Sequence, residues 1–199
     1  MRVPAHGVVG PGGAGAVQAA RLGWSILAGI CGGLAVAAPC WLHGVPAGAG
    51  WSVLGLLTGA LYGASGHRHL HALACMAALA FGMSIDFARV PPFALLAWCG
   101  AASGLADMLF LAHLRWFPVT TLAMLALMWP GAATPRACLG AALRFAGMLA
   151  AMSLAAQGVR ALAPLAGMAW SAGAMTGAML AGMLLFLHAW PSARAGGAG

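Results

Sequence analysis

Residues 70–88 read LHALACMAALAFGMSIDFA, and this segment decides the fold class because it places Asp86 inside a long apolar run. The chain has only one other acidic side chain, Asp107, among its 199 residues. An ionised Asp costs about 2.5–3.5 kcal/mol at the centre of a bilayer on insertion scales, so it usually faces the interior of a helix bundle and has a partner. Both carboxylates therefore predict positions inside such a bundle.

The composition of the whole chain is that of a polytopic membrane protein. Hydrophobic residues make up 63% of the chain and charged residues 6%, whereas a soluble domain has about 25% charged residues. A soluble fold would expose this apolar material as patches far larger than those usually tolerated. The net charge of +7 comes from arginines spread along the connections, which is typical of residues that contact lipid headgroups. We therefore expect the lipid bilayer as a partner and no nucleic acid.

Apolar runs separated by Gly, Pro, His and Arg predict an all-α, polytopic transmembrane helix bundle of seven spans. The alternation of period two that a membrane β-barrel needs is absent from the sequence. Because one run is short and contains a Trp-Pro pair near its end, six spans is the alternative. The expected spans are about residues 22–42, 47–65, 70–88, 92–112, 117–132, 138–156 and 165–190.

These spans form a single transmembrane domain, residues 21–191, between two flexible tails, residues 1–20 and 192–199. A cleaved signal peptide is the alternative for the first run, which contains a small-residue motif at 35–37. With seven spans, five arginines fall on the side of the N-terminus and three on the other side. This bias places the N-terminus in the cytoplasm of a cell with a bacterial-type inner or plasma membrane, and the C-terminus outside.

Three histidines at alternate positions, His67, His69 and His71, form the densest polar cluster of the sequence. Neutral imidazole is a common ligand of soft and borderline metals. In the seven-span topology Asp107 and His113 return to the same side, so the five residues are a candidate site for Cu, Zn or Ni. Alternate residues of a helix point about 200° apart, so convergence would need an extended connection. The alternative is a solvated, basic loop that ends a span.

Asp86 is expected to form a structural ion pair with Arg89 or Arg144. Arg89 is a helical neighbour at i,i+3. Arg144 is expected about 10 Å into the sixth span, although its long side chain can also reach the membrane surface by itself. A proton relay through Asp86 is the alternative.

A stripe of methionines follows one face of the last span. Met175, Met179 and Met183 recur every four residues, while Gly173 and Gly177 lie on the opposite face with a spacing that suits close helix packing. Thioethers are soft ligands for Cu(I), and the Met-x-x-x-Met spacing is similar to that of copper-import channels, a similarity of spacing alone. Methionine also fills irregular gaps in apolar packing, which is the alternative.

These features favour a transporter or permease for a small solute or metal ion. A non-catalytic accessory or assembly subunit of a larger membrane complex, or a self-associating protein, is the second hypothesis, because few polar residues line any pathway and small-residue faces are plentiful. An intramembrane enzyme is the third. The chain has no Glu and no hydrolase or phosphate-loop motif, so we expect no catalytic residue.

Overall fold

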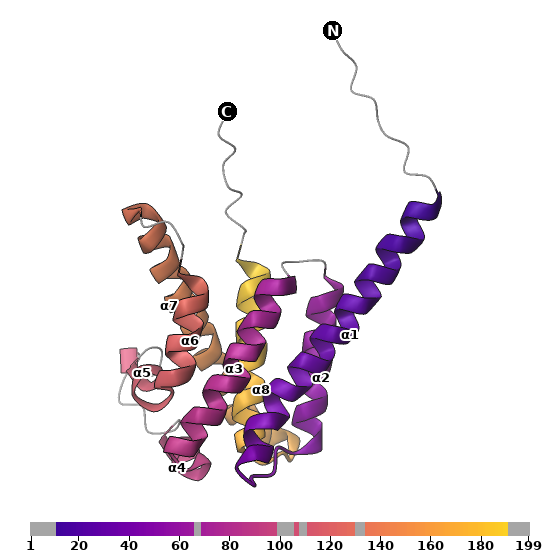
Figure 1. The fold of residues 1–199 in the computed structure, drawn as a ribbon. Helices are drawn as coiled ribbons and strands as arrows, with labels where there is room; N and C mark the ends of the chain where they lie inside the picture. Colours follow the sequence, from indigo (N-terminus) through magenta and orange to yellow (C-terminus); the bar gives the residue numbers. More distant parts are fainter. Residues whose placement is uncertain (1–10, 66–68, 99–105, 108–110, 130–133, 191–199) are drawn as a thin grey trace.

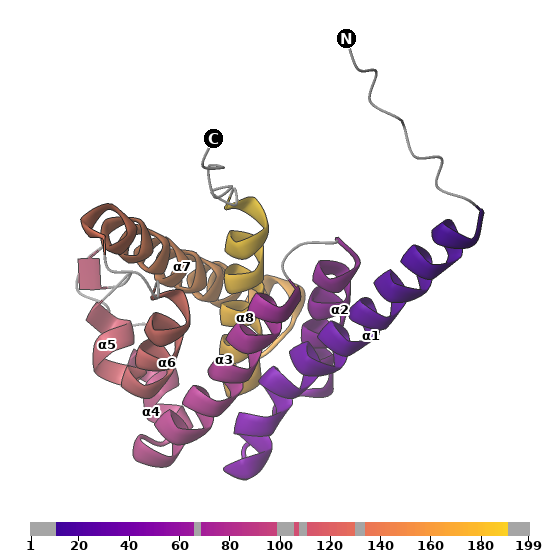
Figure 2. The ribbon, with the colours of Figure 1, turned by 45° about the horizontal axis from the view of Figure 1, so that its top comes forward.

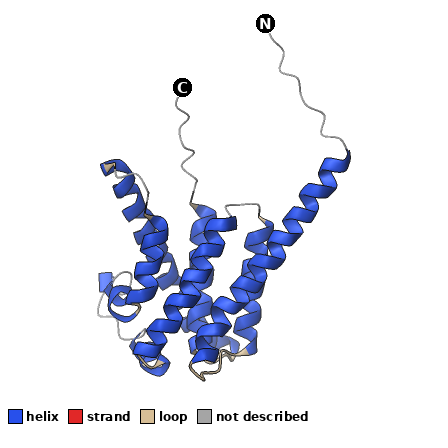
Figure 3. Ribbon diagram, in the orientation of Figure 1, coloured by secondary structure: helices blue, strands red, loops and turns tan. Residues whose placement is uncertain are grey.

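The structure is a computed structural model in which residues 11–65, 69–98, 106–107, 111–129 and 134–190 are described, and their regular structure is helical throughout (Figure 3). The all-α prediction is therefore confirmed for these residues. The helices are α1 (Pro11–Leu42), α2 (Ala49–Ala64), α3 (His69–Arg89), α4 (Pro92–Trp98), α5 (Ala112–Trp116), α6 (Pro118–Met128), α7 (Pro135–Leu162), η2 (Ala163–Ala166) and α8 (Ala172–Ala189).

The expected N-terminal tail is shorter than predicted. Helix α1 begins at Pro11, so residues 11–20 are helical. Proline is favoured in the first turn of a helix because an N–H group at that position would have no partner within the helix, so proline loses nothing by lacking one. The alanines among the residues that follow are the best helix formers. Residues 1–10 and the expected C-terminal tail lie outside the described residues.

In the part of the chain that the structure describes, four helices are long and apolar enough to cross a membrane: Gly15–Leu42, Leu70–Arg89, Pro135–Ala166 and Ala172–Ala189. Two further apolar helices are shorter, α2 with 16 residues and α6 with 11. Many large apolar side chains point away from the core, which suits a surface surrounded by lipid. The helices support a membrane protein, whereas a bundle of seven spans is not confirmed.

The expected fourth span, residues 92–112, is described only in part. Helix α4 has seven residues and α5 has five, and residues 99–105 and 108–110 between them are not described. Helix α4 begins at the Pro91-Pro92 pair, directly after α3 ends. Figure 1 shows α4 and α5 at the same end of the bundle as the C-terminal end of α3.

The longer helices alternate in direction along the chain (Figure 1). We call the top of Figure 1 the upper end. It holds the N-terminal ends of α1, α3 and α7 and the C-terminal ends of α2, α6 and α8. The lower end holds the opposite ends of these helices, together with α4, α5 and η2. Figure 2 shows that α7 is inclined to α8 rather than parallel to it.

Helix α8 is the central helix of the bundle. It is buried on all sides from Ala172 to Leu180 and contacts α1, α2, α3 and α7. A helix that is apolar all round is expected in such a position. The methionine stripe of α8 joins methionines of three other helices in one buried core. Its fully buried members are Met76, Met83, Met124, Met148, Met152, Met175, Met179 and Met183.

Small residues set the close helix crossings. A Cβ atom at Gly173 would overlap the carbonyl group of Ala47, and one at Gly82 of α3 would overlap the backbone of Thr120 of α6. Gly177 is in an ordinary contact, since a Cβ there would lie 3.7 Å from a ring carbon of Trp51. Close backbone approach is the expected mode of association where lipid removes the hydrophobic drive between helices.

Replacing Gly82 by Leu tests the crossing of α3 and α6. We expect a loss of about 1–3 kcal/mol in the free energy of unfolding, because overpacking must push the two backbones apart. Gly158→Leu on α7 is the matched control, since a Cβ at Gly158 meets open space. Melting in detergent should show a lower midpoint for Gly82→Leu only. Equal midpoints for the two variants would contradict the crossing.

Candidate binding site

Asp86 is fully buried near the lower end of α3, and its carboxylate caps the N-terminus of α6. Oδ1 accepts a hydrogen bond from the backbone N–H of Val119 at 3.1 Å, and Oδ2 accepts from the backbone N–H and the hydroxyl of Thr120 at 2.9 and 2.8 Å. Helix α6 has no side-chain cap of its own. The carboxylate therefore satisfies backbone donors that have no partner within the helix, and its charge faces the positive end of the helix dipole.

Arg89 is the ionic partner of Asp86, with 3.6 Å between Nη1 and Oδ1. The Arg89 side chain is 55% exposed, so solvent and salt weaken this pair. Arg144 is not near Asp86. It lies with Leu127 and Met128 at the opposite end of α6, whose 11 residues extend for about 16 Å. The second partner of Asp86 is therefore the pair of backbone N–H groups at the N-terminus of α6, and not Arg144 as the sequence suggested.

His113 of α5 is buried at the lower end, where its side chain contacts α7. Its Nδ1 lies 3.1 Å from the hydroxyl oxygen of Ser153, and its ring centroid is 5.9 Å from that of Phe117. Burial lowers the pKa of His113 to about 4, so the imidazole is neutral at pH 7. Its Nε2 has no hydrogen-bond partner among the described residues.

The expected metal ligands are not brought together within the described residues. His71 lies beside the C-terminal end of α6, whereas His113 precedes its N-terminal end. His67 lies outside the described residues, His69 begins α3, and Asp107 stands between α4 and α5. The described ranges contain no group of three His, Cys, Asp or Glu side chains placed to hold a metal ion. The five ligands were expected to converge because a fourth crossing would return Asp107 and His113 to the side of the other three histidines. Helices α4 and α5 both lie at the lower end, whereas α3 begins at the upper end.

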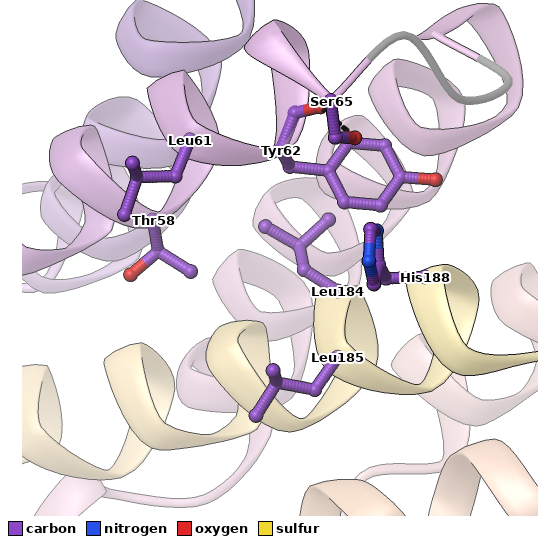
Figure 4. A pocket seen from close by; sticks show the side chains of 7 residues that line it. All are labelled: Thr58, Leu61, Tyr62, Ser65, Leu184, Leu185 and His188. Atoms are coloured by element: carbon purple, nitrogen blue, oxygen red, sulfur yellow. Dashed lines mark hydrogen bonds between the residues drawn. The ribbon is translucent and has the colours of Figure 1, made fainter.

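A hollow of about 240 Å³ lies between α2 and α8 at the upper end (Figure 4). Figure 4 shows the ring of Tyr62 facing that of His188, and the ring centroids are 6.5 Å apart in an edge-to-face arrangement. The Ser65 hydroxyl donates a hydrogen bond to the Tyr62 carbonyl at 2.6 Å. The lining residues are Thr58, Leu61, Tyr62, Ser65, Leu184, Leu185 and His188.

A second hollow of about 130 Å³ lies beside the first, and Tyr62 lines both. We call it the Arg144 hollow. Its walls come from α2, α3, α6, α7 and the C-terminal end of α8. They are formed by Tyr62, His71, Leu127, Met128, Arg144, Phe186, Leu187 and Trp190.

The Arg144 hollow carries a positive charge without a counter-charge in its walls. Arg144 is half-buried, and its guanidinium makes no hydrogen bond or ion pair with the rest of the described chain. No carboxylate is among the lining residues. The Nε2 of His71 lies 3.8 Å from the thiol of Cys75, which belongs to the methionine-rich core. The hollow can therefore attract an anionic group.

Comparison of the chain with protein-family models, with curated proteins and with solved structures finds no match in any of the three.

Sequence reasoning singled out Arg144 and His71 but missed their common hollow. It also missed Tyr62 and Thr120. The expected span 117–132 already placed a helix start near Thr120, and Pro118 is its first residue; the contact of this helix start with Asp86 was not predicted. No local signal connects Tyr62 with Arg144, because only the packing of α8 against both α2 and α7 brings them to one hollow.

Replacing Asp86 by Ala tests the cap on α6. We expect a loss of about 2–3 kcal/mol in the free energy of unfolding, because buried donors at Val119 and Thr120 lose their acceptor. Arg89→Ala should cost less than about 1 kcal/mol, because the pair is largely exposed. Unfolding titrations in mixed detergent micelles measure both changes. A larger loss for Arg89→Ala than for Asp86→Ala would show that the ion pair, rather than the cap, stabilises this end.

Proposed function

We propose that the protein is a multi-pass membrane permease that moves a small solute along the junction of α2, α3, α6, α7 and α8. The observation that supports this proposal is the Arg144 hollow, which is walled by helices from both halves of the chain. Transporters bind solutes between parts of the fold that move against each other. A hollow with walls of this kind changes shape when the two halves of the bundle shift.

The methionine-rich core supports movement of α8 against its neighbours. Methionine is unbranched and has three rotatable side-chain bonds, so methionine contacts repack at low cost. Met175, Met179 and Met183 are fully buried along α8. Stiffer, branched residues at these positions would hold α8 in one register more firmly.

We infer six crossings, by α1, α2, α3, α6, α7 and α8, with both chain ends in the cytoplasm of a bacterial-type inner or plasma membrane. Helices α2 and α6 are shorter than the usual span of about 20 residues, so both crossings need local thinning of the bilayer, and the mismatch is much larger for α6. Without Arg144, which lies within α7, the arginine bias is five against three, as it is with seven crossings. The five arginines of the cytoplasmic, upper side are Arg2, Arg21, Arg68, Arg136 and Arg194, and the three of the other side are Arg89, Arg115 and Arg160.

Cysteine labelling at two sites separates six crossings from seven. In a variant without native cysteines, Thr134→Cys should react with a membrane-impermeant maleimide only after the cells are opened, whereas Leu165→Cys should react in intact cells. If the chain crosses seven times, Thr134→Cys should instead react in intact cells, and Leu165→Cys should react only after the cells are opened. Gly44→Cys, on the outer side in both topologies, is the positive control for reagent access.

Uptake into proteoliposomes tests the permease function. The panel should contain short monocarboxylates, inorganic phosphate, neutral amino acids, Cu(I), Zn(II) and Ni(II). We expect at least one solute to enter faster than into empty liposomes.

No solute of the panel entering faster than into empty liposomes would contradict the permease. Co-purification of a stoichiometric membrane partner together with that outcome would favour the accessory-subunit function.

A soft metal ion is the second candidate solute. It is favoured by the contact of the His71 imidazole with the Cys75 thiol beside the methionine-rich core, since imidazole, thiolate and thioether are ligands that Cu(I) prefers. Uptake of Cu(I) but of no anion in the same panel would favour this candidate over an organic solute.

A further inference from the structure

We infer that the Arg144 hollow binds an oxyanion that carries a small apolar group. The role of this ligand as the transported solute rests on the proposed permease function, whereas its binding does not.

The first argument is the charge of Arg144. Its guanidinium remains protonated in proteins, and an unpaired charge in a partly apolar site is costly. Asp86 is engaged with the N-terminus of α6 at the other end of that helix. No other described residue forms an ion pair or hydrogen bond with Arg144. A bound anion supplies the missing counter-charge.

The second argument is the geometry of the guanidinium. Its planar fork of N–H donors matches the two oxygens of a carboxylate or phosphate. His71 and Tyr62 line the same hollow and bring an imidazole and a phenol to the same walls. A chloride ion offers a single acceptor centre and would not use this arrangement.

The third argument is the apolar part of the lining. Leu127, Met128 and Leu187 lie in the walls beside two aromatic rings, Phe186 and Trp190, whose centroids are 5.1 Å apart. A bare inorganic ion would leave these surfaces without a partner, whereas an apolar group on the anion would pack against them. The hollow has a volume of about 130 Å³, so the ligand is small.

Two sources supply an oxyanion with an apolar group: a small free carboxylate, and the headgroup of an anionic lipid. Both have the chemistry that Arg144 recognises. The hollow lies near the end of the bundle, where headgroups are also present. The experiment therefore needs a separate arm for each source.

The test is calorimetric titration of the purified protein in a neutral maltoside detergent. The probes are benzoate, its neutral analogue benzamide, and a short-chain phosphatidic acid. We expect wild type to bind benzoate and not benzamide, and Arg144→Gln to lose at least tenfold in affinity. Arg144→Lys should retain part of the binding, because it keeps the charge but lacks the fork. Arg136→Gln, an exposed arginine of the same helix, is the control of equal net charge and should bind as wild type does.

Leu187→Trp provides a second test that leaves every charge in place. It narrows the hollow and should weaken benzoate binding even if Arg144→Gln fails to fold. Benzoate affinity unchanged in both Arg144→Gln and Leu187→Trp would overturn the inference, as would no benzoate or lipid binding by wild type. Binding of the lipid alone supports the oxyanion site and overturns its role for a free solute.

The anion site and the permease function can be contradicted independently of each other. Benzoate binding that depends on Arg144, without uptake of any solute, supports this site and contradicts the permease. Uptake that is unchanged in Arg144→Gln, without anion binding, supports the permease and contradicts this site.

Discussion

The hydrogen bonds from the N-terminus of α6 to the Asp86 carboxylate are the interaction on which the arrangement of charges depends. They join α3 to α6 at the lower end and satisfy donors that lipid cannot satisfy. They also fix which end of α6 faces upward, so that Leu127 and Met128 reach the Arg144 hollow. Because this carboxylate is committed to a helix end, it is not available to Arg144, and the hollow keeps its positive charge.

Methionine and glycine give the bundle two different mechanical properties. Glycines hold particular backbones at close range, as Gly82 does for α3 and α6. Methionines fill the centre around α8 without rigid interlocking. The bundle therefore combines close glycine crossings, one of them at Gly173 of α8, with an adaptable core of methionines. The Arg144 hollow lies where α8 leaves that core at the upper end, so small movements of α8 alter its walls.

Composition and hydropathy predict the helical class and the ranges of several long helices, because burial in lipid demands long apolar segments. The expected spans 22–42 and 70–88 end within one residue of α1 and α3. The span expected at residues 92–112 is not confirmed, because hydropathy does not distinguish a crossing from shorter apolar helices such as α4 and α5. Local spacing predicts the Asp86–Arg89 neighbours, since helical geometry fixes them. The residues that line the hollow together with Arg144 depend on which helix ends lie at the same end of the bundle, and no local sequence pattern specifies that.

An anion held by Arg144 is the central claim of this account, and anomalous X-ray scattering from crystals soaked in 4-bromobenzoate tests it most directly. The account predicts a bromine peak within the Arg144 hollow, on the side of Phe186 and Trp190, with the carboxylate toward the guanidinium. A bromine peak only at exposed arginines such as Arg89 or Arg136, with the hollow empty, would contradict it.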